Sequence, residues 1–585
     1  KCNIDAKCKC RYQQQTFSND LHDCLMQKDT SRFWKTWNSK CNSKNKSYLI
    51  SGVDNPVDIV EKFGQHFADA CNPDGTLNAQ EKAKFEERFV LYPSHTCLSE
   101  FVDIETIDKV VYNMKKGKAA GSDSLTVEHV LYAHPAIYRI LCNLFNCMFD
   151  MGFVLDSFGA GITFPILKEP SRKSSYDLDS FRGITVSPVI SKIFEHCVLV
   201  KFSKQLDSHP AQMGFKKGLG CPHAIFCVGQ IIDIFVKGGS TVNVCTVDIS
   251  KAFDKVNFYI LLTKLMKRKL PKSLISLLHM WFCCSVFVVK WQGILSRTFV
   301  IHCGVRQGGV LSPSFFAIYV DDLLETLHSS RLGCHVKGIS VNSFMYADDL
   351  IILSASMFDM QKLLNLCTCE LNDILLRVNL KKCACIRIGK RFNAHCEQLS
   401  VAQEHIAFAD QIRYLGVYIK TGHALKFNTD SSKGKFYGCM NEILHKVGSR
   451  ETVAISLCNS YCVPMLLYAV EAMNLTKTEK LRLSSPFNRL FSKLFKSFDR
   501  SVVQQCQYYM SCLPLDYVID LRHCNFLFKL QSIDNNFIKL FADTANRDLT
   551  EICLKYNLNV NNIKSWRHTL WSSFARLIES SVWPN

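Results

Sequence analysis

The stretch "VNSFMYADDLIILSAS" at 341–356 strongly favours a β-hairpin. Phe344 and Tyr346 occupy alternate positions, Ala347 and two aspartates follow, and Leu-Ile-Ile-Leu comes directly after them. Alternation before a polar turn and a short apolar run after it are typical of two paired strands. Asp348 and Asp349 would then lie at the tip of the hairpin, held by two buried strands. Aspartate is also common in turns without catalytic roles, so this pair alone leaves both interpretations open.

A second aspartate pair, in "YVDDL" at 319–323, lies in a different pattern. Pro313 is suited to the first turn of a helix. The pattern predicts a helix that carries a solvated acidic face at Asp321 and Glu325, and no catalytic role for the aspartate pair. Four apolar residues recur with the spacing of one helix face: Phe316, Val320, Leu323 and Leu327.

A strand that ends in another aspartate precedes both pairs. In "TVNVCTVDISKAFDKVN" the strand pattern runs up to Asp248, and Ser250 is a suitable N-cap for a following helix. Two adjacent carboxylates cannot surround two metal ions, so a metal site at the hairpin needs a carboxylate from a second strand. We therefore expect Asp248 beside the hairpin tip, where crowded carboxylates favour bound cations.

Between the strand and the hairpin lies "CGVRQGGVLSP", in which Gln307 and Gly308 would let the backbone approach a planar ligand. In this order the motifs resemble those of a reverse transcriptase of the non-LTR (LINE-like) retrotransposon type, over about residues 100–470. "DISKAFD", "GVRQGGVLSP" and "YADD" resemble its motifs A, B and C, and "QIRYLGVYIK" its primer grip. "PILKEP", "FRGITVSPVISKIFE" and "QMGFKKGLGC" resemble its fingers motifs.

The resemblance implies an α+β fold of the right-hand polymerase type, with an antiparallel palm sheet and helical N- and C-terminal extensions. Composition and periodicity suggest helices and irregular basic loops before the palm, and short β-rich runs with helices within it. The expected parts are a helical N-terminal extension at 1–100, fingers at 101–235, a palm with motifs A–E at 236–420, a helical basic thumb at 421–500, and a helical C-terminal region of unassigned role at 501–585.

The resemblance also implies a catalytic site with two Mg²⁺ ions, or Mn²⁺ in their place. Asp248, Asp348 and Asp349 would hold them, with the carbonyl of Ile249. One ion would activate the primer 3′-hydroxyl, and the other would bridge the triphosphate and stabilise the pyrophosphate. The implied primer grip is Tyr414, Leu415 and Gly416.

Further residues match positions that bind the incoming nucleotide. Arginine pairs with phosphate through two hydrogen bonds and lysine supplies a point charge, which suits a triphosphate. Phe253 matches an aromatic ring that packs under the sugar and excludes a 2′-hydroxyl, which favours dNTPs, while the carboxylate Asp254 comes one residue later. The implied dNTP-binding residues are Lys168, Arg182, Phe253, Gln307, Gly308 and Lys382, with Lys381 as the alternative to Lys382.

The net charge of +18 favours a polyanionic partner. We expect an RNA template held through its backbone, together with a DNA primer or target. No membrane partner is expected, because the longest apolar stretch, at 273–289, is short and interrupted. The 29 cysteines favour a reduced intracellular location, in nucleus and cytoplasm. Cys2, Cys8 and Cys10 lack a paired CxxC and give little support for zinc.

These expectations describe an RNA-directed DNA polymerase, a nucleotidyltransferase of a retrotransposon, which extends a DNA 3′-hydroxyl by target priming. A decayed or domesticated nucleic-acid-binding protein with the same fold is the main alternative. A group II intron maturase or telomerase would share the aspartate triad, and a membrane-surface protein would not need it. Because the sequence begins at Lys1, we expect a piece of a longer protein, with any endonuclease upstream.

Overall fold

The computed structural model describes residues 15–41, 49–72, 75–93, 100–168, 175–401, 403–448, 450–560 and 562–582. Cys2, Cys8 and Cys10, which were considered as zinc ligands, lie outside these ranges. Within the described ranges, no helix has both the length and the apolar character that a membrane crossing requires.

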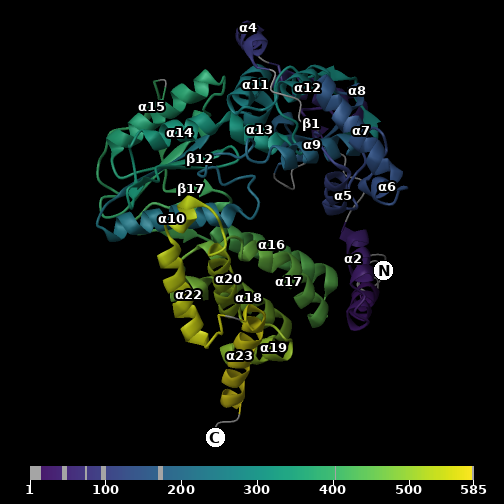
Figure 1. The fold of residues 1–585 in the computed structure, drawn as a ribbon. Coiled ribbons are helices and arrows are strands. Elements are labelled where there is room, and N and C mark those ends of the chain that lie inside the picture. Colours follow the sequence, from purple (N-terminus) through teal and green to yellow (C-terminus); the bar gives the residue numbers. More distant parts are fainter. Residues whose placement is uncertain are drawn as a thin grey trace.

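The central sheet has five strands in the order β11-β12-β5-β13-β16, and it is antiparallel except for its last pair. Helix α10 lies below this sheet in Figure 1, and helices α14 and α15 lie above it. This arrangement confirms the α+β fold with an antiparallel palm sheet. The elements are β5 (Val242–Asp248), β11 (Ser343–Tyr346), β12 (Asp349–Ser354), β13 (Ala384–Ile388), β16 (Ala407–Phe408), α10 (Cys221–Lys237), α14 (Asp321–Ser329) and α15 (Met357–Asp373).

A second sheet has the order β4-β2-β6-β7, with β8 also paired to β6. Its first strands fall where the sequence suggested only helices and loops. Pro165 obscures the strand pattern of β2, but β2 pairs with β6 only up to Thr163, so the missing N–H leaves that pairing intact. Helix α3 packs on this sheet. The elements are α3 (Pro56–Ala70), β2 (Ala160–Leu167), β4 (Phe181–Val186), β6 (Val286–Trp291), β7 (Ile294–Leu295) and β8 (Phe299–Val300).

Helices surround the two sheets on the side opposite the C-terminus (Figure 1). Aromatic rings fill much of the space between them, as in the stacked pair Phe101 and Phe149, whose centroids are 4.7 Å apart. These helices are α4 (Gly75–Leu91), α5 (Ile104–Asn113), α6 (Val127–Leu131), α7 (Ala136–Met151), α8 (Asp156–Gly159), α9 (Val189–Lys201), α11 (Phe258–Lys267), α12 (Lys272–Cys283) and α13 (Ser312–Tyr319).

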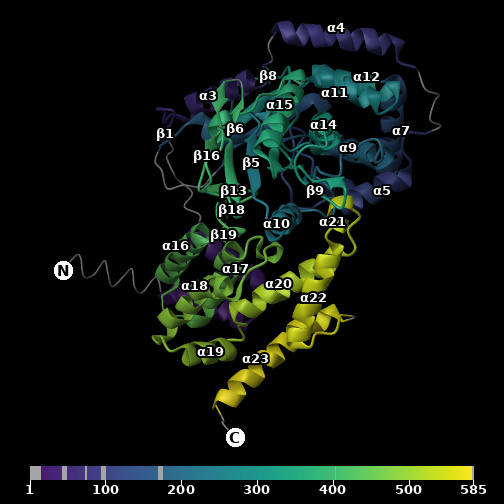
Figure 2. The ribbon, with the colours of Figure 1, turned by 90° about the vertical axis from the view of Figure 1, so that its left-hand side faces the viewer.

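The chain after the central sheet forms a three-stranded antiparallel sheet and then helices only. Figure 2 shows α20 and α22 beside one another, with α23 leading away to the C-terminus. Helix α2 of the N-terminal part packs against α17 through Trp34 and Tyr461. The elements are α2 (Thr30–Cys41), β17 (Gln411–Tyr414), β18 (Val417–Lys420), β19 (Lys426–Asn428), α16 (Asp430–Val447), α17 (Glu451–Leu466), α18 (Lys477–Phe495), α19 (Arg500–Tyr509), α20 (Leu515–Leu530), α21 (Asn536–Lys539), α22 (Ala542–Tyr556) and α23 (Trp566–Val582).

Short pairs of strands complete the fold. They are β1 (Leu49–Ile50) with β3 (Ser175–Tyr176), β9 (His335–Val336) with β10 (Ile339–Ser340), and β14 (Ser400–Val401) with β15 (Glu404–His405).

The helix expected to begin at Ser250 begins later. Lys251 has a positive φ of 45°, and residues Ala252–Lys255 form one 3₁₀ turn instead. Helix α11 then starts at Phe258, where the side chain of Asn257 accepts hydrogen bonds from two backbone N–H groups. Phe253 therefore lies on a short turn directly after β5, not on a long helix.

Candidate active site

The predicted hairpin is present, and it places its aspartates at one end of the central sheet. Tyr346 pairs with Asp349, so Ala347 and Asp348 form a two-residue turn. Ala347 has a φ of 58°, as the tight hairpin turns that match strand twist require. On the other side of β12, Asp349 pairs with Asp248 at the end of β5. Three carboxylates from two adjacent strands therefore meet at one edge.

The carboxylates perturb one another. Burial, with the negative charges of Asp348 and Asp248, raises the pKa of Asp349 to about 6. Burial and the charge of Asp248 also raise the pKa of Asp348. Arg182 opposes both shifts, but does not cancel them. Each shift means that the ionised cluster is disfavoured until cations neutralise it.

These residues fit a divalent cation in their chemistry. Carboxylate oxygens are the ligands that Mg²⁺ prefers, and the crowding of Asp248, Asp348 and Asp349 is relieved by positive charge. Across the described parts of the chain, no three His, Cys, Asp or Glu side chains are already closed into a metal site. The protein thus supplies the donor set, and the positions of ions relative to it stay a prediction.

A cleft of about 1480 Å³ opens in front of these aspartates. It brings together residues that are far apart in the sequence, from the second sheet, the central sheet and the loop before α13. The predicted site residues that line it are Lys168, Arg182, Asp248, Ile249, Phe253, Gln307, Gly308, Asp348, Asp349 and Lys382. Their roles remain predictions, but their gathering in one cleft is what a nucleotide site requires.

Three basic side chains face the carboxylates in this cleft. Lys382 Nζ lies 3.5 Å from an oxygen of Asp248. Lys168 donates a hydrogen bond to the carbonyl of Asp179 at 2.6 Å. Burial lowers the pKa of Lys168, and the charges of Lys382 and Arg182 act in the same direction. Cations that repel one another across a cleft favour an anion such as a triphosphate between them. Lys381, the alternative to Lys382, does not line the cleft.

The loop before α13 is fixed against β4. The amide of Thr185 donates to the carbonyl of Gln307 at 2.7 Å, so this loop extends the edge of the second sheet. Gly308 has a φ of 121°, and a Cβ there would lie 2.5 Å from the carbonyl oxygen of Thr185. Only glycine fits this position, because both the backbone conformation and the space exclude a side chain.

Phe253 forms part of an aromatic stack beside the aspartates. Its ring lies 4.5 Å from that of Phe316 at an interplanar angle of 14°, and Phe215 meets it edge-on at 6.0 Å. The neighbouring Asp254 is engaged elsewhere, because it accepts a hydrogen bond from Gln307 Nε2 at 2.9 Å. Burial raises the pKa of Asp254. The carboxylate next to the ring is thus committed to the glycine loop.

The predicted primer grip is a second tight hairpin, and it lies outside the wall of the cleft. Leu415 and Gly416 have φ values of 45° and 85° between β17 and β18. Tyr414 is buried behind the turn. Tyr468 Oη donates to the carbonyl of Leu415 at 3.1 Å, which joins this hairpin to the segment after α17. The charge of Arg413 on the same strand reaches Asp349.

Sequence reasoning missed two contributors to the cleft. His66, from helix α3, lies 3.7 Å from Asp179 and lines the cleft with Cys71. No local pattern identified them, because α3 was assigned to an N-terminal extension and reaches the cleft only through its packing on the second sheet. Asp254 was placed correctly beside Phe253, but its pairing with Gln307 could not be read from spacing.

The "YVDDL" prediction was correct about the buried face and about Glu325, whose side chain is exposed, and wrong about Asp321. Phe316, Val320, Leu323 and Leu327 are all buried. The helix breaks at Val320, and Asp321 begins a new helix, α14. There Asp321 is not solvated: its side chain is 14% exposed and forms an ion pair with Arg268. A carboxylate at a helix start is favourable because it meets unpaired backbone N–H groups and the positive end of the helix dipole.

Comparison with known proteins matches the central part of the chain to one family model. Residues 167–419 match the family model "Reverse transcriptase (RNA-dependent DNA polymerase)". The chain is 25% identical over 286 residues to the Pol polyprotein from the type-2 retrotransposable element R2DM of Drosophila melanogaster, which covers 48% of this chain and 27% of that protein. It is 24% identical over 326 residues to the RNA-directed DNA polymerase from the mobile element jockey of the same species, covering 54% and 35%.

The chain therefore spans about a quarter to a third of these two relatives. Among solved structures, telomerase from Candida albicans aligns with 86% of this chain and 93% of its own, at 12% identity and a TM-score of 0.37.

Proposed function

We propose that this chain is an RNA-directed DNA polymerase of the LINE-like type, because residues 167–419 match the reverse transcriptase family model and the chain is similar to the retrotransposon proteins R2DM and jockey. It would extend a DNA 3′-hydroxyl on an RNA template, with nicked target DNA as the source of that hydroxyl. The observation that carries this proposal is the meeting of Asp248, Asp348 and Asp349 at one edge of the sheet, in a cleft that also holds Lys168 and Arg182.

The residues of the cleft would have separate roles in nucleotide addition. Arg182 and Lys168 would hold the triphosphate, since both line the cleft and their charges repel one another there. Lys382, which lies beside Asp248, would hold the end of the triphosphate that leaves as pyrophosphate. Divalent cations, when bound by the three aspartates, would supply activation of the 3′-hydroxyl and charge stabilisation. The protein's own contribution is position, because the oxygen, the phosphorus and the cations must meet at one point.

Selection of dNTPs would rest on Phe253. Its ring is fixed by stacking on Phe316 and by the edge of Phe215, so it cannot rotate away from a sugar above it. An added 2′-hydroxyl would meet an apolar surface that offers it no hydrogen bond. Asp254, the next residue, is oriented toward the glycine loop by the hydrogen bond that its Oδ1 accepts from Gln307.

An RNA template, a DNA primer and dNTPs are thus the proposed partners, with Mg²⁺ as the proposed cofactor. The net charge of +18 supports binding of nucleic acid through its phosphates. We extend the proposal to a reduced intracellular location, which the free buried thiols such as Cys245 and Cys385 support.

Incorporation of dNTPs by the purified chain tests this proposal. The assay would combine an RNA template, a DNA primer and Mg²⁺ with the parent protein, Asp348→Asn, and Asp543→Asn as a matched control. Asp543 is exposed and lies on α22, away from the cleft. We expect incorporation by the parent and the control, and its loss in Asp348→Asn. A folded parent that binds RNA but incorporates nothing would favour the alternative, a decayed nucleic-acid-binding protein.

A further inference from the structure

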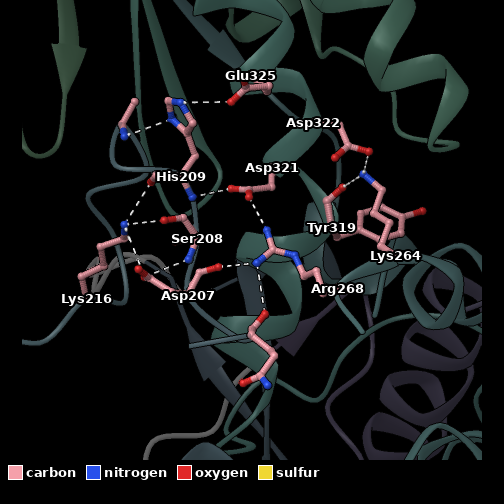
Figure 3. A network of polar contacts seen from close by, with 12 residues as sticks. Asp207, Ser208, His209, Lys216, Lys264, Arg268, Tyr319, Asp321, Asp322 and Glu325 are labelled. Carbon is pink, nitrogen blue, oxygen red and sulfur yellow. Dashed lines mark hydrogen bonds and ion pairs between the residues drawn. The ribbon is translucent and has the colours of Figure 1, made fainter. Parts of the chain in front are cut away.

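The segment 207–216, which overlaps the start of the "QMGFKKGLGC" motif at 212–221, is held at both of its ends by a polar network (Figure 3). Asp321 accepts a hydrogen bond from the backbone N–H of His209 at 2.6 Å and pairs with Arg268. Arg268 also donates to the carbonyl of Asp207 at 2.5 Å. Lys216 folds back to donate to the carbonyls of Ser208 and His209, at 2.7 and 3.0 Å. The "YVDDL" aspartate therefore fixes a loop and lies outside the cleft.

The middle of this segment lies against the catalytic hairpin as an added strand. The backbone N–H of Met213 donates to the carbonyl of Met345 at 2.8 Å, and the N–H of Met345 donates to Ala211 at 3.0 Å. Gln212 pairs with Met345 in a parallel bridge. The hairpin that carries Asp348 and Asp349 is thus supported from the side opposite β5.

Gln212 makes the closest contact with the turn itself. Its side chain is fully buried. Its Nε2 donates to the carbonyl of Ala347 at 3.1 Å, and its Oε1 accepts from the N–H of Ala347 at 3.0 Å. The same Oε1 accepts from Gly214 at 3.0 Å. One planar amide therefore satisfies both backbone groups of the residue that precedes Asp348 and has a positive φ.

The neighbours of Gln212 explain why the loop can come so close. A Cβ on Gly214 would lie 2.4 Å from the backbone nitrogen of Ala347, so only glycine permits this approach. Phe215 then turns with a φ of 65° and meets the ring of Phe253. A single short segment thus contacts both the turn that carries Asp348 and the ring proposed to select the sugar.

We propose that Gln212 is a positioning residue that fixes the peptide groups of Ala347 and so the direction of the Asp348 carboxylate. Left-handed backbone at a non-glycine residue costs energy and persists only where the surroundings determine it. The side-chain amide of Gln212 holds Ala347 in this conformation, because rotation of either peptide plane of Ala347 breaks a buried hydrogen bond. This role rests on the proposed function for its catalytic consequence, but the contact itself does not.

Gln212→Met tests the proposal, because methionine keeps the length of the side chain and removes both hydrogen-bonding groups. Gln507→Met is the matched control, since Gln507 is also buried and donates to Asn488 on the distant helices α18 and α19. Hydrogen exchange of the peptide that contains Ala347 reads the contact directly. Primer extension gives kcat and the KM for dNTP, each normalised to folded protein.

We expect exchange at Ala347 to be about tenfold faster in Gln212→Met, the factor that corresponds to one lost hydrogen bond. kcat should fall by a similar factor while KM for dNTP changes less than twofold, and Gln507→Met should change neither. Gln212→Glu, which keeps the acceptor for Ala347 N–H, should retain the protection and is the second variant if Gln212→Met does not fold.

Unchanged exchange at Ala347 in Gln212→Met would overturn the contact. Faster exchange with unchanged kcat would overturn the positioning role. A parent protein without incorporation would instead contradict the proposed function, and the exchange measurement would still decide whether Gln212 fixes the turn.

Discussion

Replacement of Asp321 by asparagine distinguishes the two aspartate pairs. We expect the pair at 321–322 to affect mainly stability and the pair at 348–349 to affect mainly activity. Asparagine keeps the shape and one acceptor for the N–H of His209, but removes the charge that faces Arg268. Arg268 keeps its hydrogen bonds to the carbonyls of Gln205 and Asp207, so it is not left without partners. Burial raises the pKa of Asp321 despite Arg268, which shows that desolvation already offsets part of the attraction.

From these contacts we expect Asp321→Asn to destabilise the fold by ~1.5–3 kcal/mol, the value of a hydrogen bond to a charged group. The full cost of breaking a buried pair, roughly 3–5 kcal/mol, should not be reached. Nucleotide incorporation per folded molecule should stay within about tenfold of the parent, because Asp321 acts only through the loop at 207–216. Asp348→Asn should reduce incorporation by at least about a hundredfold.

Urea unfolding of the parent, Asp321→Asn, Arg268→Met and the double variant measures the pair as a double-mutant cycle. Primer extension at a temperature where all four are folded measures activity. An Asp321→Asn protein that is as stable as the parent but incorporates nothing would refute the reasoning, since it would make "YVDDL" the catalytic pair. So would full activity in Asp348→Asn.

Three further predictions follow from the cleft. Gly308→Ala should lower kcat/KM by about tenfold or more, because a Cβ would lie against the carbonyl of Thr185 and the backbone conformation is strained; steady-state kinetics measure this. The pKa of Asp349 is raised to about 6 in the folded protein, so protonation of this group stabilises the metal-free fold. This stabilisation is complete below about pH 4, the unfolded pKa, and is lost as the pH rises through about 6. Mg²⁺ should therefore raise Tm more at pH 7.5 than at pH 5, and an equal shift in thermal melts would contradict the assignment. Phe253→Ala should raise the use of rNTPs relative to dNTPs by about tenfold or more, as competition assays with both nucleotides would report.

The elements closest to the proposed chemistry were the easiest to predict. The strands of the hairpin and β5 are short, rich in apolar and β-branched residues, and bounded by polar residues, so local patterns identify them. A metal site at Asp348 and Asp349 needs a third carboxylate, so we expected β5 to lie beside the hairpin. The register of the sheet, in which Asp349 pairs with Asp248, agrees with this expectation. The strand β2 was missed because Pro165 breaks the pattern that would have announced it.

The supporting contacts could not be predicted in the same way. The break between α13 and α14 at Val320 hardly changes the spacing of the apolar residues. Hydrophobic periodicity therefore does not detect the break, and it predicts that Asp321 is exposed to solvent. Gln212 is separated from Ala347 by 135 residues, and nothing in its neighbourhood indicates that distance in space. His66 reaches the cleft through tertiary packing alone. Local patterns determine elements, whereas contacts between them depend on the whole fold.

The C-terminal helices have a consequence for how such a chain can change over generations. Phe537 of α21 is buried against Phe344 of the β11–β12 hairpin, and Asn535 donates to the carbonyl of Pro210 at 3.0 Å. Cys524 and Leu527 of α20 belong to the same apolar core as the central sheet. Recombination that exchanged everything after residue 500 would therefore uncover the back of the hairpin. The central sheet and these helices share one core, so substitutions on one side of the predicted boundary at residue 500 would have to be compensated on the other.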